Sequence, residues 1–287
     1  MLFLKQSIDP REFAFQYPRR VRHSAGSINT HPVMHYLTID NAKTIKGESE
    51  GYLTGILYLA PHTLAGGPNV CPHATAACKA SCLYSAGRGA FSNVQEARIR
   101  KTKEFFRDRA EFVDRLADDI VSLIRMAKAQ GLKPAVRLNG TSDLPWEKFG
   151  GKVERKNLMG RFPSVQFYDY TKNPDRASLF ARGGISLNYH LTFSLSETNR
   201  DKAIALLEDG CNVAAVFATG RNQELPLEFL GRPVIDGDRS DLRFLEQGWQ
   251  GQRGNIVGLR AKGQAKHDRG GFVLPGDEDP TPMVMTA

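Results

Sequence analysis

Three of the four cysteines in this chain, Cys71, Cys78 and Cys82, lie within twelve residues of one another. Each thiol can become a thiolate, and several thiolates in one loop are a common way to hold an iron–sulfur cluster or a zinc ion. A local trio without a nearby fourth cysteine predicts a [4Fe–4S] cluster that leaves one iron open to a substrate. This spacing favours an enzyme.

A structural zinc site is the main alternative for the same loop. Cys71, His73, Cys78 and Cys82 would together satisfy tetrahedral zinc, although the paired short-loop spacing of zinc knuckles and ribbons is absent. A third alternative is that these are incidental buried thiols. Cys211 begins an apolar run far downstream, so we expect a core thiol there. Cys211 would be a fourth ligand only if the order of the strands brings it to the loop.

Glycines lie on both sides of the cysteines, at 66–67 and again at Gly87 and Gly89. Because glycine has no Cβ, such segments let the backbone approach a cofactor closely. We therefore predict that Gly87, Arg88 and Gly89 bind the cofactor.

The surrounding elements must position this loop, and they alternate between strands and helices. Apolar residues recur at helical spacing over 92–130, with a break near 108–110 and a stop at Gly131. The break divides this segment into two helices. A further helix ends at Gly210 and takes Ser196 or Thr198 as its N-cap. The predicted strands, which are apolar and β-branched, are 33–39, 55–60, 135–139, 165–170, 185–194, 211–217, 233–236 and 256–260.

Repeated strand–helix units predict an α/β protein with a parallel sheet. We expect a single-domain (β/α) barrel, closed or partial and TIM-like; the alternative is a doubly wound sheet, against which the missing GxGxxG motif counts. In this prediction residues 1–50 form an irregular N-terminal extension packed on the barrel. Residues 51–265 form the barrel, with the iron–sulfur loop at 66–90, and residues 266–287 form a C-terminal tail.

Polar side chains follow the predicted strands at their carboxyl ends. Asn139, Asp143, Lys172 and Asp236 all occupy such positions. Because the carboxyl ends of barrel strands meet at one rim, where active sites are assembled, these four are our candidate catalytic residues. For the segment around Asp236, a tight turn followed by a capped helix is an equally good interpretation.

Alternation along the strand at 165–170 places Tyr168 and Tyr170 on one face and Asp169 on the other. The two rings would either fill the barrel interior or stack on a base. We expect His190, in the next strand, to be a core histidine rather than a catalytic base.

The chain of 287 residues carries a net charge of +8, which favours anionic partners such as a nucleotide, another small anionic substrate or nucleic acid. A solvated basic face without a partner is the alternative. No apolar run is long enough to cross a membrane, and the N-terminus does not resemble a secretory signal. We therefore expect a cytoplasmic protein with no membrane partner. In that reducing compartment, clustered cysteines bind metal more often than they form disulfides.

Several segments together resemble the phage-encoded gene product 88 family. They are the early cysteine loop, VQFYDYTKNP, VIDGDRSDLRFLEQ and IVGLRAKGQA, and the resemblance spans about residues 50 to 265. It implies a bacteriophage or prophage origin, and therefore a host cytoplasm, more than it implies a reaction.

A three-cysteine loop after an early strand also resembles radical S-adenosylmethionine enzymes, in topology and in ligand number. That resemblance implies S-adenosylmethionine as a second cofactor, although the usual C-x3-C-x2-C spacing is replaced here by C-x6-C-x3-C. The sequence therefore predicts an iron–sulfur enzyme that acts on a polar, anionic or nucleotide-like substrate by radical or Lewis-acid chemistry. The alternatives are a zinc-stabilised nucleic-acid-binding protein without catalysis, and a structural or host-interaction protein.

Overall fold

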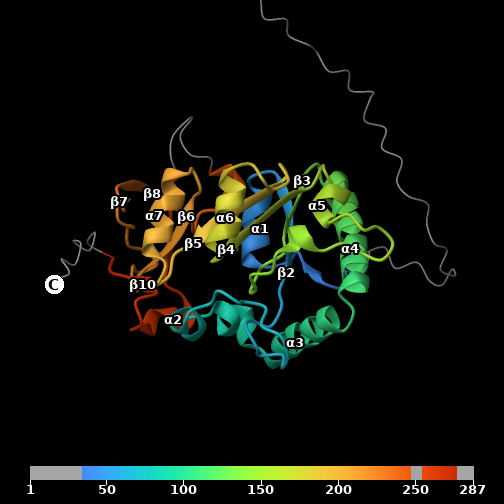
Figure 1. Ribbon diagram of the computed structural model, residues 1–287, viewed down its shortest axis with the longest axis horizontal. Coiled ribbons are helices and arrows are strands. Elements are labelled where there is room, and N and C mark those ends of the chain that lie inside the picture. Colours follow the sequence, from blue (N-terminus) through green and yellow to red (C-terminus); the bar gives the residue numbers. More distant parts are fainter. Residues whose placement is uncertain (1–33, 247–253, 277–287) are drawn as a thin grey trace, which may run out of the picture. The chain divides into compact units, whose positions relative to one another are not determined.

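Ten strands form one mixed sheet in the computed structural model, which describes residues 34–246 and 254–276 (Figure 1). The described residues all belong to one compact unit. The strands are β1 (Leu37–Thr38), β2 (Tyr52–Leu57), β3 (Lys133–Arg137), β4 (Gln166–Thr171), β5 (Tyr189–Ser194), β6 (Val213–Phe217), β7 (Glu228–Phe229), β8 (Arg232–Asp236), β9 (Ile256–Arg260) and β10 (Val273–Leu274).

The order of the strands confirms the predicted α/β class, with a sheet that is mostly parallel. From edge to edge the order is β1-β2-β3-β4-β5-β6-β9-β8-β7, and β2 to β6, β9 and β8 all pair in parallel. The short strands β1 and β7 pair antiparallel at the two edges.

The predicted barrel is not closed. Within residues 34–246 and 254–276, no strand pairing joins the β1 edge to the β7 edge. The reason is the path of the chain after β6: β9 inserts next to β6, so β8 is displaced outward and its remaining edge is taken by the β7–β8 hairpin. A closed TIM barrel is therefore a wrong prediction for this part of the chain.

The apolar spacing over 92–130 correctly predicts the two longest helices in the described residues. The 92–130 segment forms two helices that break at Asp108, whose side chain caps the second by accepting a hydrogen bond from the Glu111 amide. Gly131 follows the second helix with a φ of +68°, which suits glycine best. The helices are α1 (Ala42–Glu48), α2 (Ala76–Ala80), α3 (Ser92–Arg107), α4 (Arg109–Ala129), α5 (Leu158–Arg161), α6 (Pro174–Ala181) and α7 (Arg200–Glu208).

Three details differ from the predictions. Residues 42–48 form a helix, begun by a capping box between Asn41 and Thr44, where an irregular extension was expected. Helix α7 begins after Asn199, so neither Ser196 nor Thr198 is its cap. In the expected tail, β10 adds to the carboxyl half of β6. Residues 1–33 of the 1–50 prediction, including Val33 of the predicted first strand, lie outside the described residues.

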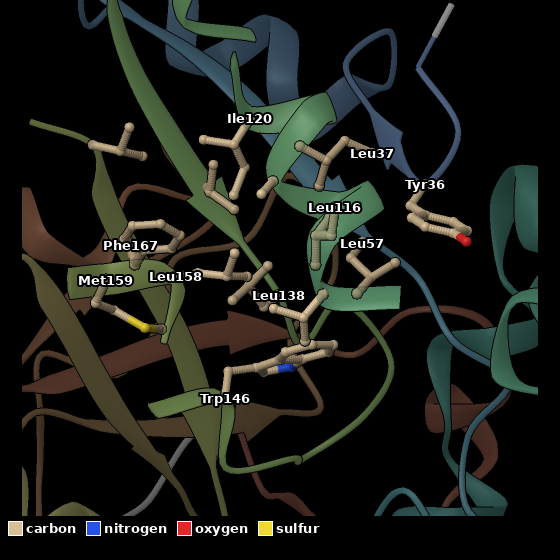
Figure 2. Packing of buried hydrophobic residues seen from close by; sticks show 14 of the residues in the cluster. Tyr36, Leu37, Leu57, Leu116, Ile120, Leu138, Trp146, Leu158, Met159 and Phe167 are labelled. Atoms are coloured by element: carbon tan, nitrogen blue, oxygen red, sulfur yellow. The ribbon is translucent and has the colours of Figure 1, made fainter. Parts of the chain in front are cut away.

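One face of the sheet is covered by helices and buries the main apolar core. Helix α4 packs on β2 and β3, while α6 and α7 pack on β4 to β6. Figure 2 shows Leu116 and Ile120 of α4 beside Leu57 and Leu138, with Trp146 below them. All five side chains are fully buried, so removing this apolar surface from water stabilises the sheet.

The opposite face carries α1 and the segment that follows β8. Gly47 of α1 lies against Thr54 of β2, and a Cβ at Gly47 would meet the Thr54 hydroxyl at 2.9 Å. Phe244 packs on Tyr52 and Tyr168 with ring centroids 5.0 and 5.5 Å apart. This face has a smaller apolar cluster and the charged groups described below. No helix in the described part of the chain is long and apolar enough to cross a membrane.

Candidate functional site

A cavity of about 360 Å³ lies at the carboxyl ends of the parallel strands. Its wall includes residues from β3, β4, β5, β6 and β9, from the loop after β2 and from the segment after β8. Cys71, Cys78 and Cys82 all line it. Figure 1 shows the α2–α3 segment, which carries Cys78 and Cys82, along the lower edge of the sheet.

The backbone of the loop holds the first cysteine against the end of β3. The His62 amide donates to Cys71 Sγ at 3.4 Å, and Cys71 Sγ lies 3.7 Å from the Thr141 carbonyl oxygen. Cys78 is in α2, whose N-cap residue Thr75 accepts a hydrogen bond from the Cys78 amide. Cys82 follows just after the end of α2, in extended conformation. The four-residue spacing therefore places one cysteine on a helical turn and the other immediately beyond it.

Two carboxylates tie this short helix to the rest of the sheet. Glu197, after β5, accepts hydrogen bonds from the Thr75 hydroxyl at 2.8 Å and from the Ala77 amide at 3.1 Å. The Ser81 hydroxyl donates to Asp268 at 3.3 Å. Contacts that span more than a hundred residues of sequence thus fix the segment that carries Cys78 and Cys82.

The three thiols are close enough to act on one another electrostatically. Burial, together with the neighbouring Cys82, Asp143 and Cys78, raises the pKa of Cys71 to about 12 against the lowering effect of the His62 amide. Burial also raises the pKa of Cys82, with a contribution from Cys78.

The three cysteines are the donors that either a cluster or a single metal ion would use. No group of three or more His, Cys, Asp or Glu side chains in residues 34–246 and 254–276 forms a preassembled site for one ion. A single zinc ion needs four donors around one point, whereas a cluster takes one thiolate at each of several separate iron atoms. The three cysteines line one cavity wall, where each could bind a separate iron atom. His73, the proposed fourth zinc ligand, is exposed and does not line the cavity.

Three of the four candidate catalytic residues meet at this cavity. Asn139, Asp143 and Lys172 line it, from the carboxyl ends of β3 and β4. Lys172 Nζ donates to the Ser194 hydroxyl at 2.5 Å and lies 5.1 Å from the centroid of the Phe272 ring. Lys172 and the cysteines are thus exposed to the same space.

Asn139 and Asp143 are held by several protein contacts. Asn139 Oδ1 accepts from the Ser142 hydroxyl, the Leu144 amide and the Trp146 indole. Asp143 accepts from the Lys172 amide and from the guanidinium of Arg176. Asn139 is only 2% exposed, so its role in the structure is to shape the turn that follows β3.

The remaining predicted site residues do not reach the cavity. Asp236 ends β8 and pairs with Arg260 at 3.0 Å, while its neighbours Gly237 and Asp238 line the wall. Gly87, Arg88 and Gly89 form a separate turn, in which Arg88 is exposed and pairs with Asp40. This turn follows the cysteine loop in the chain, after α2 has ended at Ala80.

Cys211 lies away from the loop, in the core. Its side chain is fully buried in the apolar cluster formed by α6, α7 and β6, and Sγ lies 3.8 Å from the Leu191 carbonyl oxygen. It does not line the cavity, which confirms the prediction of a core thiol. His190 is also partly buried, against Phe180, and burial lowers its pKa to about 4.

The sequence analysis missed a charged cluster on the same cavity. Arg137 donates to both oxygens of Asp241, at 2.9 and 3.1 Å, and Lys43 Nζ lies 3.5 Å from the same carboxylate. Lys46 and Lys262 also line the wall. One available signal was Arg137 itself, a charged residue near the end of a strand with apolar neighbours. Another was the Lys43–Lys46 spacing, which places both on one face of a helix.

Comparison with known proteins gives one result. A family model described as Gene product 88 matches residues 35–275. The chain belongs to the gene product 88 family. No curated protein and no solved structure matches it. Membership in the gene product 88 family confirms the resemblance seen in the sequence, whereas the likeness to radical S-adenosylmethionine enzymes stays a prediction.

Proposed function

We propose that this gene product 88 protein is an enzyme that holds a [4Fe–4S] cluster through Cys71, Cys78 and Cys82 and acts on a small anionic substrate. The observation that carries the proposal is that all three cysteines line one cavity together with Lys172. The cavity is of the size that small-molecule sites have in enzymes. Such a cluster supplies an open iron that acts as a Lewis acid, or an electron when S-adenosylmethionine is the co-substrate.

The residues of the chain would supply binding and proton chemistry around that group. Lys172 presents an ammonium to the cavity, where it would orient an anionic group or donate a proton to one that develops. Asn139 acts as a positioning residue, because it fixes the turn whose Thr141 carbonyl lies beside Cys71. Glu197 would keep Cys78 in place through Thr75 and the start of α2.

Several observations favour this proposal over a zinc-stabilised nucleic-acid-binding protein. His73 is exposed and does not line the cavity that the three cysteines line, and the basic residues described above line the wall of that cavity. A duplex or a single strand needs a basic groove or face along which its backbone can run. The phage origin that the family implies supports a host cytoplasm as the compartment of such an enzyme.

The test is anaerobic purification followed by iron, sulfide and zinc analysis and a visible spectrum. We expect a brown protein with about four irons per chain. Cys78→Ser should lose the colour and most of the iron. Cys211→Ser removes a thiol outside the cavity and should keep both, which makes it the matched control. One zinc per chain without iron would overturn the proposal and support the nucleic-acid-binding alternative.

Addition of S-adenosylmethionine to the reduced protein then separates the two kinds of chemistry. Reductive cleavage to methionine and 5′-deoxyadenosine would support radical chemistry. If the cofactor stays intact while the iron is present, the Lewis-acid form of the proposal remains and the radical form fails.

A further inference from the structure

A second group of charges lines the cavity and comes from elements other than the cysteine loop. We call it the basic end; it consists of Lys43, Lys46, Arg137, Arg260 and Lys262. Two carboxylates, Asp238 and Asp241, line the same part of the wall. Five cations against these two anions leave an excess of positive charge on this part of the wall, which Asp236, outside the wall, reduces by pairing with Arg260.

The charges of the two arginines are already neutralised by protein carboxylates. Arg137 binds both oxygens of Asp241 through one nitrogen, and its Nε is buried without a hydrogen-bond partner. Arg260 pairs with Asp236 and Asp238 and also donates to the Gln223 carbonyl. Every guanidinium nitrogen of Arg260 therefore has a protein partner, and the unpartnered Nε of Arg137 is buried.

The three lysines keep most of their donors. Lys46 donates to the Asp238 carbonyl oxygen, and Lys262 Nζ lies 2.5 Å from the Asp238 carboxylate. Lys43 lies 3.5 Å from Asp241. An ammonium has three N–H donors, so each lysine can make this contact and still bind a ligand.

Burial and neighbouring cations act on Lys43 in the same direction. Partial burial, with repulsion from Arg137 and Lys262, lowers the pKa of Lys43 to about 8 against the opposing effect of Asp241. A bound anion would relieve both the repulsion and the lost hydration. The neighbouring wall supplies room for the rest of a ligand, because Val216, Leu259 and Phe272 line it with apolar surface.

We propose that the basic end binds the phosphate group of a phosphorylated substrate, with Lys43, Lys46 and Lys262 as donors. This inference rests on the proposed function, because it names the substrate class of the same cavity. A phosphate monoester carries up to two negative charges and has several acceptor oxygens around a tetrahedral centre. Three separate point-like ammonium groups match that geometry, whereas a single carboxylate would be satisfied by one arginine fork.

The test uses the purified protein, inorganic phosphate as the probe and isothermal titration calorimetry. Acetate at matched ionic strength serves as the carboxylate probe. We expect phosphate to bind at least about tenfold more tightly than acetate, and Lys262→Gln to weaken phosphate binding by about tenfold. Lys262 is 57% exposed in its side chain, so this variant should fold, which a melting curve checks. Lys202→Gln removes the same charge from an exposed position in α7 and is the matched control.

The outcomes separate this inference from the proposed function. Equal binding of acetate and phosphate, unchanged binding in Lys262→Gln, or equal weakening by Lys202→Gln would each overturn the phosphate site. Iron is measured on the same samples. Phosphate binding in a protein that never takes up iron overturns the cluster alone, and iron without phosphate binding overturns the phosphate site alone.

Discussion

Two buried carboxylates, on opposite faces of the sheet, are stabilised in different ways. Asp241 lies on the cavity face, where it accepts hydrogen bonds from Arg137 and from the Tyr168 hydroxyl at 3.2 Å. Asp169 lies on the face covered by helices, where it accepts from the Asn139 amide at 2.6 Å and from the Tyr189 hydroxyl at 2.7 Å. Asp241 therefore has cationic partners, whereas Asp169 accepts its hydrogen bonds only from uncharged groups.

The two environments move the pKa values in opposite directions. Burial alone would raise the pKa of Asp241, but Arg137 and Lys43 outweigh it and hold that pKa well below its usual range. For Asp169, burial raises the pKa to about 7, and the Tyr189 hydroxyl, Arg176 and the Asn139 amide offset it only in part. The difference shows that a direct cationic partner keeps Asp241 ionised, whereas Asp169 contacts only dipoles and Arg176 acts on it without a direct hydrogen bond.

The largest expected effect comes from removing the charge on the cavity face. Asp241→Asn leaves Arg137 buried without its counter-charge, so we expect a loss of about 3–5 kcal/mol in the free energy of unfolding. Urea denaturation at neutral pH measures it. The double variant Arg137→Met, Asp241→Leu removes both charges and should be more stable than the single variant. If Asp241→Asn costs less than about 1 kcal/mol, this pair is not the main stabiliser of the cavity face.

The second effect is the pH dependence that the helix-covered face imposes. The pKa of Asp169 is higher in the folded chain than in the unfolded one, so its contribution is complete below about pH 4 and is lost as the pH rises through about 7. Between about pH 5 and pH 7 this group should remove about 2–3 kcal/mol of stability. Asp241 behaves in the opposite way: its contribution is present above about pH 4 and is lost only in acid.

Comparing wild type with Asp169→Asn across pH 5 to 8 isolates this dependence from the other titrating groups. The slope between pH 5 and 7 should be shallower in the variant. A variant that retains the wild-type slope would show that Asp169 is not the group responsible.

A smaller effect is the direct cost of Asp169→Asn. At about pH 5 the asparagine amide must face one of the donors that now serve the carboxyl group, so we expect a loss of about 1–2 kcal/mol. The cost should shrink toward pH 8, because wild type then bears a buried charge that the variant lacks. Asp201→Asn, at an exposed position in α7, is the control and should change stability by less than about 0.5 kcal/mol. If the loss in the free energy of unfolding caused by Asp169→Asn grows with pH, the pKa of Asp169 is not raised by its environment under the helices.

Local patterns predicted most of the strands and the helices α3, α4 and α7, but not α1 on the cavity face, and no local pattern predicts the pairing of charges across the sheet. The strands, the break between α3 and α4 and the position of the cysteine loop follow from periodicity, caps and glycines, which act over a few residues. Alternation along β4 correctly separated Tyr168 from Asp169. The Arg137–Asp241 pair joins residues 104 apart, and no local rule selects such a partner. The same limit explains why Asn139, Asp143 and Lys172 were found while Lys43 was missed: strand ends are visible in the sequence, and the docking of α1 is not.

The smallest effect tests whether Asp241 depends on both of its cationic neighbours. Lys43 is 39% exposed in its side chain and 3.5 Å from Asp241, so Lys43→Gln should cost less than about 1 kcal/mol at pH 7. Because Lys43 helps to lower the pKa of Asp241, its loss should raise that pKa, and acid unfolding should begin at a higher pH than in wild type. Lys202→Gln again controls for net charge. Unfolding midpoints measured from pH 2 to pH 5 test this prediction. If the midpoints of Lys43→Gln and wild type fall with the same dependence on pH in this range, Arg137 alone holds the Asp241 carboxylate ionised. In that case Lys43 is not needed to stabilise the cavity face and is left free for a ligand.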